Sequence, residues 1–309
     1  MAPKLMTPKR AERRRQRREA PMAYRLQRQA RPSRLRAYAW RAIREAAGAL
    51  PSEELGLTHL ELPLRHLPRA LDGLSILHVT DLHLTAGAHA ADAIVPLLGG
   101  EHYDLTVYTG DLADDEGGMR ALAPLLRALR PREGAFAVLG NHDHYHYRHA
   151  TGEGPSPNDL GPLLRTLEDG DVRLLDNTND SLYDGALRVV GVDDPSLGLD
   201  RLGDAFAGVP GEAATLLLAH SPDVLVRLGR YRPGLLLAGH THGGQLRVPG
   251  LGPIGSVSVL PRRYSMGAYV YDGVQTYVSR GVGASGAPAR WNCPPEVTVI
   301  RLRSPRALR

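Results

Sequence analysis

The chain has 309 residues, 42% of them hydrophobic, so it is long enough to bury one large core. Its single cysteine, Cys293, excludes an internal disulfide framework and a cysteine-rich zinc site, which leaves His, Asp and Asn for any metal chemistry. The net charge of +5 is unevenly placed: residues 1–50 hold 15 Lys and Arg against three Glu, whereas residues 51–309 hold 23 basic and 30 acidic residues.

The first 50 residues form a basic arm that differs in composition from the rest of the chain. Residues 1–32 are highly charged and poor in apolar residues, which is typical of disorder. From Ser33 apolar residues recur at helical spacing among arginines, so we predict a short basic amphipathic helix within 33–50. Such a helix could pack on the neighbouring domain, lie on an anionic membrane surface or follow a nucleic-acid backbone, and the pattern leaves all three open.

The sequence has neither a stretch of about 18 apolar residues nor the apolar segment of a secretory signal after its arginine-rich start. We therefore expect a cytoplasmic protein, attached peripherally to the inner face of the membrane if the arm binds lipid.

From residue 51 onward, short apolar runs alternate with helical patterns, which indicates one α/β domain over 51–309. The predicted strands are 74–80, 105–110, 135–140, 172–175, 187–192, 215–220, 235–240, 268–273, 274–279 and 296–302. The predicted helices lie near 88–99, 117–130, 158–169, 200–207 and 222–229.

Five of these strands end in residues that can bind a metal ion. The candidate ligands are Asp81, His83, Asp111, Asn141, His220, His240 and His242, and His142 directly follows Asn141. In an open α/β sheet, loops beyond the carboxyl ends of strands meet in one crevice, so these side chains are expected to converge. Side chains at i and i+2 of extended backbone point the same way, which would bring each D-x-H or H-x-H pair in together.

Imidazoles, carboxylates and one amide oxygen suit manganese, iron or zinc better than calcium or magnesium. Seven ligands are too many for one ion with an open position and match two divalent ions bridged by a carboxylate. Each feature alone has an ordinary explanation, since a buried His is usually a hydrogen-bonded core residue and Asp111 could cap a helix. Asp114 and Asp115 could orient the metal ligands through hydrogen bonds, or they could lie at the N-terminus of a helix, where negative charge is favourable. Because ligand-type residues occur at all five strand ends, a site for two metal ions is favoured over these separate explanations.

The ordered patterns D-x-H, G-D, G-N-H-D, H and G-H-T-H, from Asp81 to His242, resemble those of the calcineurin-like metallophosphoesterase family. The stretches "GHTHGGQLRVPGLGP" and "YVSRGVGASGAPARWNCPPEVTVIRL" are similar to the bacterial branch with the YkuE-type phosphodiesterases. The resemblance covers about residues 55–303. It implies a four-layer α/β/β/α sandwich in which two mixed sheets are flanked by helices.

The resemblance also implies a role for each matching residue. One metal would be held by Asp81, His83, Asp111 and His242, and the second by Asp111, Asn141, His220 and His240. His142 would be the general acid and Asp143 its orienting partner. Protein serine/threonine phosphatases of the superfamily carry an Arg after the G-D step and Glu in G-N-H-E; "GDLADDEGG" and "GNHD" lack both, which argues against that activity.

We therefore predict hydrolysis of a phosphodiester or pyrophosphate linkage in a nucleotide-, lipid- or envelope-related substrate, through attack by a hydroxide that bridges the two ions. Contacts to the substrate are expected from the histidine-rich loop and the glycine-rich segment, at His144, His146, Arg148 and Arg280, with Tyr145, Tyr147 and Arg290 nearby. An exposed polar loop and a turn framework would explain the same residues. The alternatives are a nuclease, disfavoured by the acidic body, and a non-catalytic scaffold, disfavoured because no ligand is missing.

Overall fold

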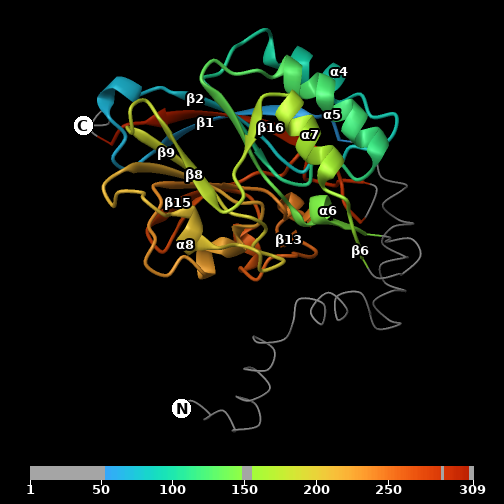
Figure 1. Ribbon diagram of the computed structural model, residues 1–309. Helices are drawn as coiled ribbons and strands as arrows, with labels where there is room; N and C mark the ends of the chain where they lie inside the picture. The colour runs from blue at the N-terminus through green and yellow to red at the C-terminus, as the bar shows by residue number, and fades with distance from the viewer. Residues whose placement is uncertain (1–52, 148–154, 287–288, 306–309) are drawn as a thin grey trace, which may run out of the picture.

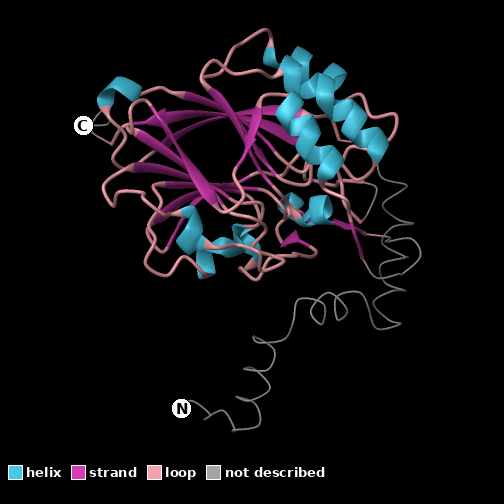
Figure 2. Ribbon diagram, viewed as in Figure 1, coloured by secondary structure: helices cyan, strands magenta, loops and turns pink. Residues whose placement is uncertain are grey.

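Two six-stranded mixed sheets form the body of the protein, in a computed structural model that describes residues 53–147, 155–286 and 289–305 (Figures 1 and 2). In spatial order, the first sheet holds β1 (Gly56–Pro63), β16 (Glu296–Arg303), β2 (Ser75–Val79), β3 (Leu105–Thr109), β4 (Gly134–Val138) and β7 (Val172–Leu174). The second holds β14 (Gly267–Tyr271), β15 (Val274–Val278), β11 (Leu235–Ala238), β10 (Ala214–Leu218), β9 (Leu187–Gly191) and β8 (Thr178–Leu182).

The centre of each sheet is parallel, and this matters for the position of the site. Strands β2, β3, β4 and β7 run parallel, as do β9, β10, β11 and β15. The carboxyl ends of β2, β3 and β4 therefore lie along one edge of the first sheet, and those of β10 and β11 along one edge of the second. Two further antiparallel pairs are short, β5 (Tyr145–His146) with β6 (Ser156–Pro157) and β12 (Arg247–Val248) with β13 (Gly252–Pro253).

The two sheets pack face to face because their strands alternate apolar side chains between two faces. On β10, Leu216 and Leu218 join Ile76, Val107 and other residues of the first sheet in a core between the sheets, whereas Leu217 lies in a separate cluster on the outer face. These side chains are fully buried. A sheet that is apolar on both faces needs cover on both sides, which dictates four layers.

Helices supply the outer layers (Figure 2). The first sheet is covered by α4 (Ala90–Ile94), α5 (Glu116–Ala128) and α7 (Gly161–Asp169), whose isoleucine and leucines share a core cluster with residues of β2 and β3. The second is covered more thinly, by α8 (Leu202–Ala205) and the 3₁₀ turn η3 (Pro222–Val226). The remaining short elements are α6 (Asn141–His144), η1 (Arg69–Leu71), η2 (Val95–Leu98), η4 (His242–Gly244) and η5 (Arg262–Tyr264). The predicted sandwich of two mixed sheets flanked by helices is confirmed.

The differences from the sequence prediction have local causes. All ten predicted strands are present, but β1 and β8 were not predicted. Both are edge strands with many half-exposed polar residues, so they lack a clear apolar alternation. The helix predicted near 88–99 changes into η2 where Pro96 cannot donate a helical hydrogen bond, and that near 222–229 is only the 3₁₀ turn η3.

Residues 1–52 lie outside the described part of the chain, so the basic arm, its helix within 33–50 and the domain boundary after residue 50 stay predictions. Within the described ranges, the helices are too short and too polar to cross a membrane.

A buried glutamate joins the two sheets. The carboxylate of Glu296 on β16 is 4% exposed and accepts hydrogen bonds from Thr58 on β1 (2.7 Å) and from the Tyr277 hydroxyl on β15 (3.0 Å). It also accepts from the backbone N–H (2.9 Å) and the guanidinium (2.5 Å) of Arg280. Burial opposes ionisation, but these donors prevail and lower the pKa of Glu296 below its ordinary value.

We expect Glu296→Gln to lower the free energy of unfolding by about 1–3 kcal/mol near pH 7, because an amide NH₂ would face donors that now meet a carboxylate oxygen. Since the folded-state pKa is lowered, this contribution is present above the ordinary value of 4.5 and is lost as the pH falls through the folded value. Urea unfolding of both proteins between pH 3 and 7 measures it, and the difference should shrink at the acid end.

The matched control is Glu61→Gln, which breaks an exposed pair with Arg303 on the same sheet and should have a smaller effect. Equal stability of Glu296→Gln and the wild type at pH 7 would contradict the role given to Glu296.

Candidate metal centre

The seven predicted metal ligands all lie just beyond the carboxyl ends of strands from both sheets, five in loops and the other two, Asn141 and His242, at the start of α6 and η4. They follow β2, β3 and β4 in the first sheet and β10 and β11 in the second. Each is at most 9% exposed, which is unusual for such polar side chains unless they are paired or bind an ion. The ligands are Asp81, His83, Asp111, Asn141, His220, His240 and His242.

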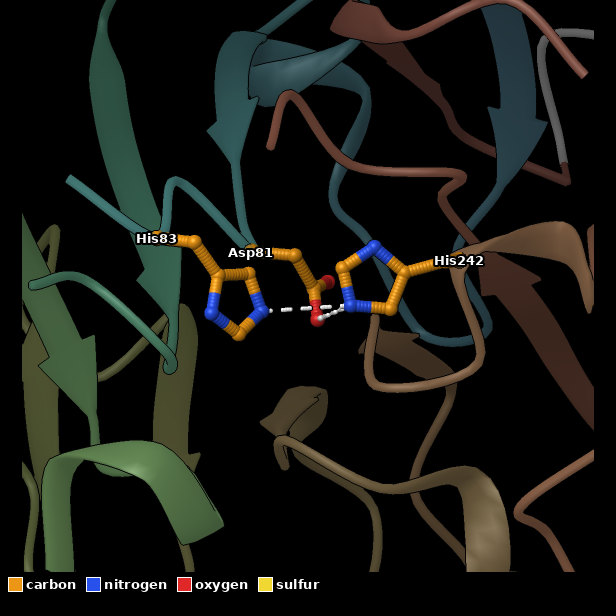
Figure 3. A group of neighbouring side chains, drawn as sticks. All are labelled: Asp81, His83 and His242. Atoms are coloured by element: carbon orange, nitrogen blue, oxygen red, sulfur yellow. Dashed lines mark hydrogen bonds and ion pairs between the residues drawn. The ribbon is translucent and has the colours of Figure 1, made fainter. Parts of the chain in front are cut away.

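One group of donors consists of Asp81, His83 and His242, whose side chains point toward one another (Figure 3). The Nε2 atoms of His83 and His242 are 3.2 Å apart, and Nε2 of His242 lies 3.4 Å from an oxygen of Asp81. Their ligand atoms all fall within 4.8 Å of one another. Three such donors converging on one point can hold a divalent cation.

A second group lies around His220, with Asp111 shared between the two. Nε2 of His220 is 3.3 Å from Oδ2 of Asp111 and 3.1 Å from Nδ1 of His240. The same Oδ2 atom lies 3.5 Å from Nε2 of His83, in the first group. The carboxylate of Asp111 therefore stands between two sets of imidazoles, as a bridging ligand would.

Asn141 offers an acceptor atom that has no donor among the described residues. Its Oδ1 atom is buried and has no hydrogen-bond partner in the described part of the protein. A buried amide oxygen without a donor is costly, and a cation would satisfy it. The mixture of imidazole, carboxylate and amide donors thus fits divalent ions such as manganese, iron or zinc.

The backbone is strained at these residues. Asp81, His83, Asp111, His240 and His242 all have left-handed φ values, between 45° and 70°. This conformation costs about 1–3 kcal/mol for a residue other than glycine and persists only where the surroundings impose it. Strands β2 and β11 already end at Val79 and Ala238. The prediction that extended backbone brings each pair into the site was therefore wrong: left-handed turns do so.

Close backbone packing around Asp81 requires glycine. A Cβ atom on Gly239 would lie 2.1 Å from Oδ2 of Asp81 and 2.3 Å from Oγ1 of Thr80. The next residue, His240, donates its backbone N–H to both Asp81 oxygens at 3.0 Å. The loop of the second sheet thus holds the carboxylate of the first sheet in place.

The buried charges of the centre shift one another's pKa values. Burial raises the pKa of Asp81, and burial together with the charge of His220 lowers that of His240 to about 3. Although burial opposes both changes, the imidazoles of His220 and His142 lower the pKa of Asp111, and Asp111 raises that of His220. In the cluster, positive imidazole charge compensates negative carboxylate charge. Bound cations can compensate the carboxylates instead, with release of the imidazole protons.

His142 lies beside the donor groups with both ring nitrogens near polar atoms. Its Nδ1 is 3.4 Å from Asp114, which also contacts Nδ1 of His83 at 3.0 Å, and its Nε2 is 3.2 Å from the Ser285 hydroxyl. His142 and Ser285 also line a pocket with Asp114, Tyr145, His146, Tyr147, Ala284 and Gly286.

The carboxylate of Asp143 has a different task from the one predicted. It accepts hydrogen bonds from the backbone N–H groups of Gly140 (2.8 Å), Asp111 (2.8 Å) and Leu112 (2.9 Å). Asp143 therefore shapes the loops that carry Asp111 and Asn141. The prediction that it orients His142 is corrected, because Asp114 is the carboxylate found beside that ring.

Comparison with known proteins agrees with this geometry. Residues 74–244 match the model of the family described as calcineurin-like phosphoesterase. The chain belongs to the calcineurin-like phosphoesterase family. It is therefore a metal-dependent phosphoric ester hydrolase.

Among its relatives is the Bacillus subtilis (strain 168) protein "Uncharacterized metallophosphoesterase YkuE", 31% identical over 77% of this chain and 82% of that one. "Uncharacterized metallophosphoesterase YkoQ" of the same strain is 28% identical over 73% of this chain and 82% of that protein. The bovine "Transmembrane protein with metallophosphoesterase domain" is 31% identical over 80% of this chain, but the match spans only 57% of its length. These matches place the chain in the YkuE-type branch of the phosphoesterase family.

The described residues that were predicted to contact substrate have different surroundings. His146 lines the pocket beside His142, whereas Nε2 of His144 lies 2.7 Å from Asp193. The guanidinium of Arg280 is bound to Glu296, and Arg148 lies outside the described residues. Substrate contacts by these four residues stay predictions.

No sequence pattern indicated a role for Ser285, and the roles of Asp114 and Arg290 stayed open. The guanidinium of Arg290 is 5% exposed and donates to the carbonyls of Arg280 (2.7 Å) and Gly281 (3.1 Å), so it is a framework residue behind His242. Asp115 caps α5 through the N–H of Gly118 at 2.7 Å. The G-D-x-x-D spacing could have pointed to Asp114.

We expect Gly239→Ala to weaken metal binding about 10- to 100-fold, because the added methyl group would displace the Asp81 carboxylate. Metal content after dialysis against a buffered metal solution measures the effect, with circular dichroism to confirm folding. Gly211→Ala is the control, since a Cβ atom there meets open space. Full metal content in Gly239→Ala would contradict the proposed position of Asp81.

Proposed function

We propose that the protein hydrolyses a phosphodiester or pyrophosphate linkage at a centre of two divalent ions. Asp81, His83, Asp111 and His242 would hold one ion, and Asp111, Asn141, His220 and His240 the other. The observation that carries this proposal is the position of Asp111, whose Oδ2 atom lies 3.5 Å from His83 and 3.3 Å from His220. One carboxylate between two donor sets is the arrangement that two neighbouring ions require.

When bound, two such ions supply an activated water and neutralise charge on the phosphate oxygens. The chain itself supplies the proton for the departing oxygen. His142 and Ser285 line one pocket, where a leaving group can approach the ring, and Asp114 lies 3.4 Å from Nδ1 and orients it. A positioned acid of this kind matters most for alcohol leaving groups, which depart poorly as alkoxides.

The pocket beside His142 is small, about 70 Å³, so it can receive one planar or apolar part of the leaving group. Its walls combine the rings of Tyr145, His146 and Tyr147 with the small residues Ala284 and Gly286. Aromatic walls accept a planar or apolar group, and the small residues leave room for it. We therefore extend the proposal to nucleotide-, lipid- or envelope-related phosphoesters.

The first test is hydrolysis of bis-p-nitrophenyl phosphate and of the p-nitrophenyl monoester by metal-stripped protein resupplied with Mn²⁺, Fe²⁺, Zn²⁺ or Co²⁺. We expect diester cleavage that returns with metal and that Asp111→Asn lacks, because Asn cannot supply a bridging charge. Bound metal without diester cleavage under any of the four ions would count against a phosphodiesterase.

We expect His142→Gln to keep its metal content while kcat falls about 10²- to 10⁴-fold for a diester with an alkyl leaving group. The loss should be smaller for p-nitrophenolate, which leaves without a proton. The ratio of kcat values for the two substrates, compared between wild type and variant, measures this difference. The same loss for both leaving groups would show that His142 does not act as the acid.

A further inference from the structure

An apolar and basic loop projects beside the metal centre. Eight large hydrophobic side chains are exposed in the described part of the protein, and four of them lie within residues 251–259. Leu251 is 84% exposed, Val259 70%, Val257 66% and Ile254 46%. We call residues 249–263 the apolar loop. Gathered exposure of this kind marks an interaction surface, since single exposed apolar residues are ordinarily scattered.

The charge of this region has one sign. Residues 245–271 contain Arg247, Arg262 and Arg263 and no Asp or Glu. Arg262 and Arg263 are exposed and are the last two residues of the apolar loop. Asp223 of η3, which contacts the apolar loop, is 7% exposed, and its carboxylate accepts from the hydroxyl of Ser258 and the backbone N–H of Val259. The exposed face of the loop is thus apolar and cationic.

Three of the exposed apolar residues in the apolar loop have backbone N–H groups that are hydrogen-bonded to residues outside the loop. The N–H of Leu251 donates to Val248 (3.1 Å), that of Ile254 to Leu246 (3.0 Å) and that of Val259 to Asp223 (3.0 Å). Moving an exposed apolar side chain out of water costs little free energy only if the backbone N–H of that residue is already hydrogen-bonded within the protein. Otherwise the N–H group loses its hydrogen bond to water. Three of the four exposed apolar residues meet that condition.

The apolar loop is anchored to the turn that carries His242. The guanidinium of Arg247 donates to the carbonyl of Gly243 at 2.6 Å, and the hydroxyl of Thr241 donates to the carbonyl of Ser265 at 2.5 Å. Gly244 packs so closely on Pro253 of β13 that a Cβ atom there would lie 2.2 Å from the proline Cβ. In Figure 1, β13 lies on the opposite side of the molecule from α4 and α5.

We propose that the apolar loop docks the protein on the surface of an anionic lipid bilayer. Leu251, Ile254, Val257 and Val259 enter the interfacial region, and Arg262 and Arg263 contact the lipid phosphates. Charge complementarity favours this occupant over a second copy of the chain, because a copy would bring the same arginines against themselves. Docking would hold the mouth of the metal centre close to the lipid headgroups. The proposal depends neither on the basic arm nor on the proposed catalytic activity.

The test places an environment-sensitive fluorophore on the full-length protein through Leu251→Cys. The native Cys293 is fully buried, so labelling is confined to the new site. The control label goes on Leu164→Cys of α7, which is 39% exposed in the helical layer of the first sheet. Vesicles of phosphatidylcholine alone and with phosphatidylserine are added, with brominated lipids as quenchers.

We expect a blue shift and quenching for the label at position 251 with anionic vesicles, and no change for the label at position 164. Arg262→Gln combined with Arg263→Gln should weaken vesicle binding roughly 30-fold. A label at 251 that stays in water would overturn the proposal, whether or not the protein sediments with the vesicles. Equal binding to both vesicle types, or a blue shift that follows protein concentration without lipid, would also overturn it, the latter in favour of self-association.

Discussion

The structure depends on how the buried carboxylate of Asp111 is compensated. This side chain is 3% exposed, and it lies between imidazoles that come from different sheets, His83 after β2 and His220 after β10. Removing such a charge from water costs several kcal/mol unless partners and hydrogen bonds replace the solvent. The N–H of His142 supplies one of these bonds at 2.8 Å. The centre can therefore exist only where the edges of the two sheets meet.

The tightly packed strands that precede the proposed metal ligands sustain the backbone strain at these residues. Five of the proposed ligands hold left-handed backbone conformations, each at a cost of about 1–3 kcal/mol. The strands that precede them are fully buried on both faces, so the chain enters each turn from a fixed direction. Two well-packed clusters on β10 and β11 thus compensate for a site whose local geometry is unfavourable.

The glycine-rich segment between β15 and β16 connects the junction of the sheets to the chemistry. Glu296 holds Arg280 at the start of this segment, and Arg290 binds the carbonyls of Arg280 and Gly281. The N–H of Gly283 donates to the carbonyl of Asp81 at 2.6 Å, and Ser285 reaches Nε2 of His142. A single segment thereby links a structural carboxylate, the first metal ligand and the proposed acid.

Residue type and local pattern in the sequence determined ten of the strands and the ligand-type residues at five strand ends, and the four-layer sandwich followed from the resemblance to a known family. Apolar runs and their polar ends are local properties, so they can be read without coordinates. Only the tertiary structure decided which group satisfies each polar atom. In the tertiary structure, Asp114 lies beside His142. The carboxylate of Asp143 accepts hydrogen bonds from three backbone N–H groups, and the guanidinium of Arg280 donates to Glu296. The tertiary structure also showed that left-handed turns position the paired ligands. These choices depend on the packing of segments distant in the chain, for which local patterns carry no signal.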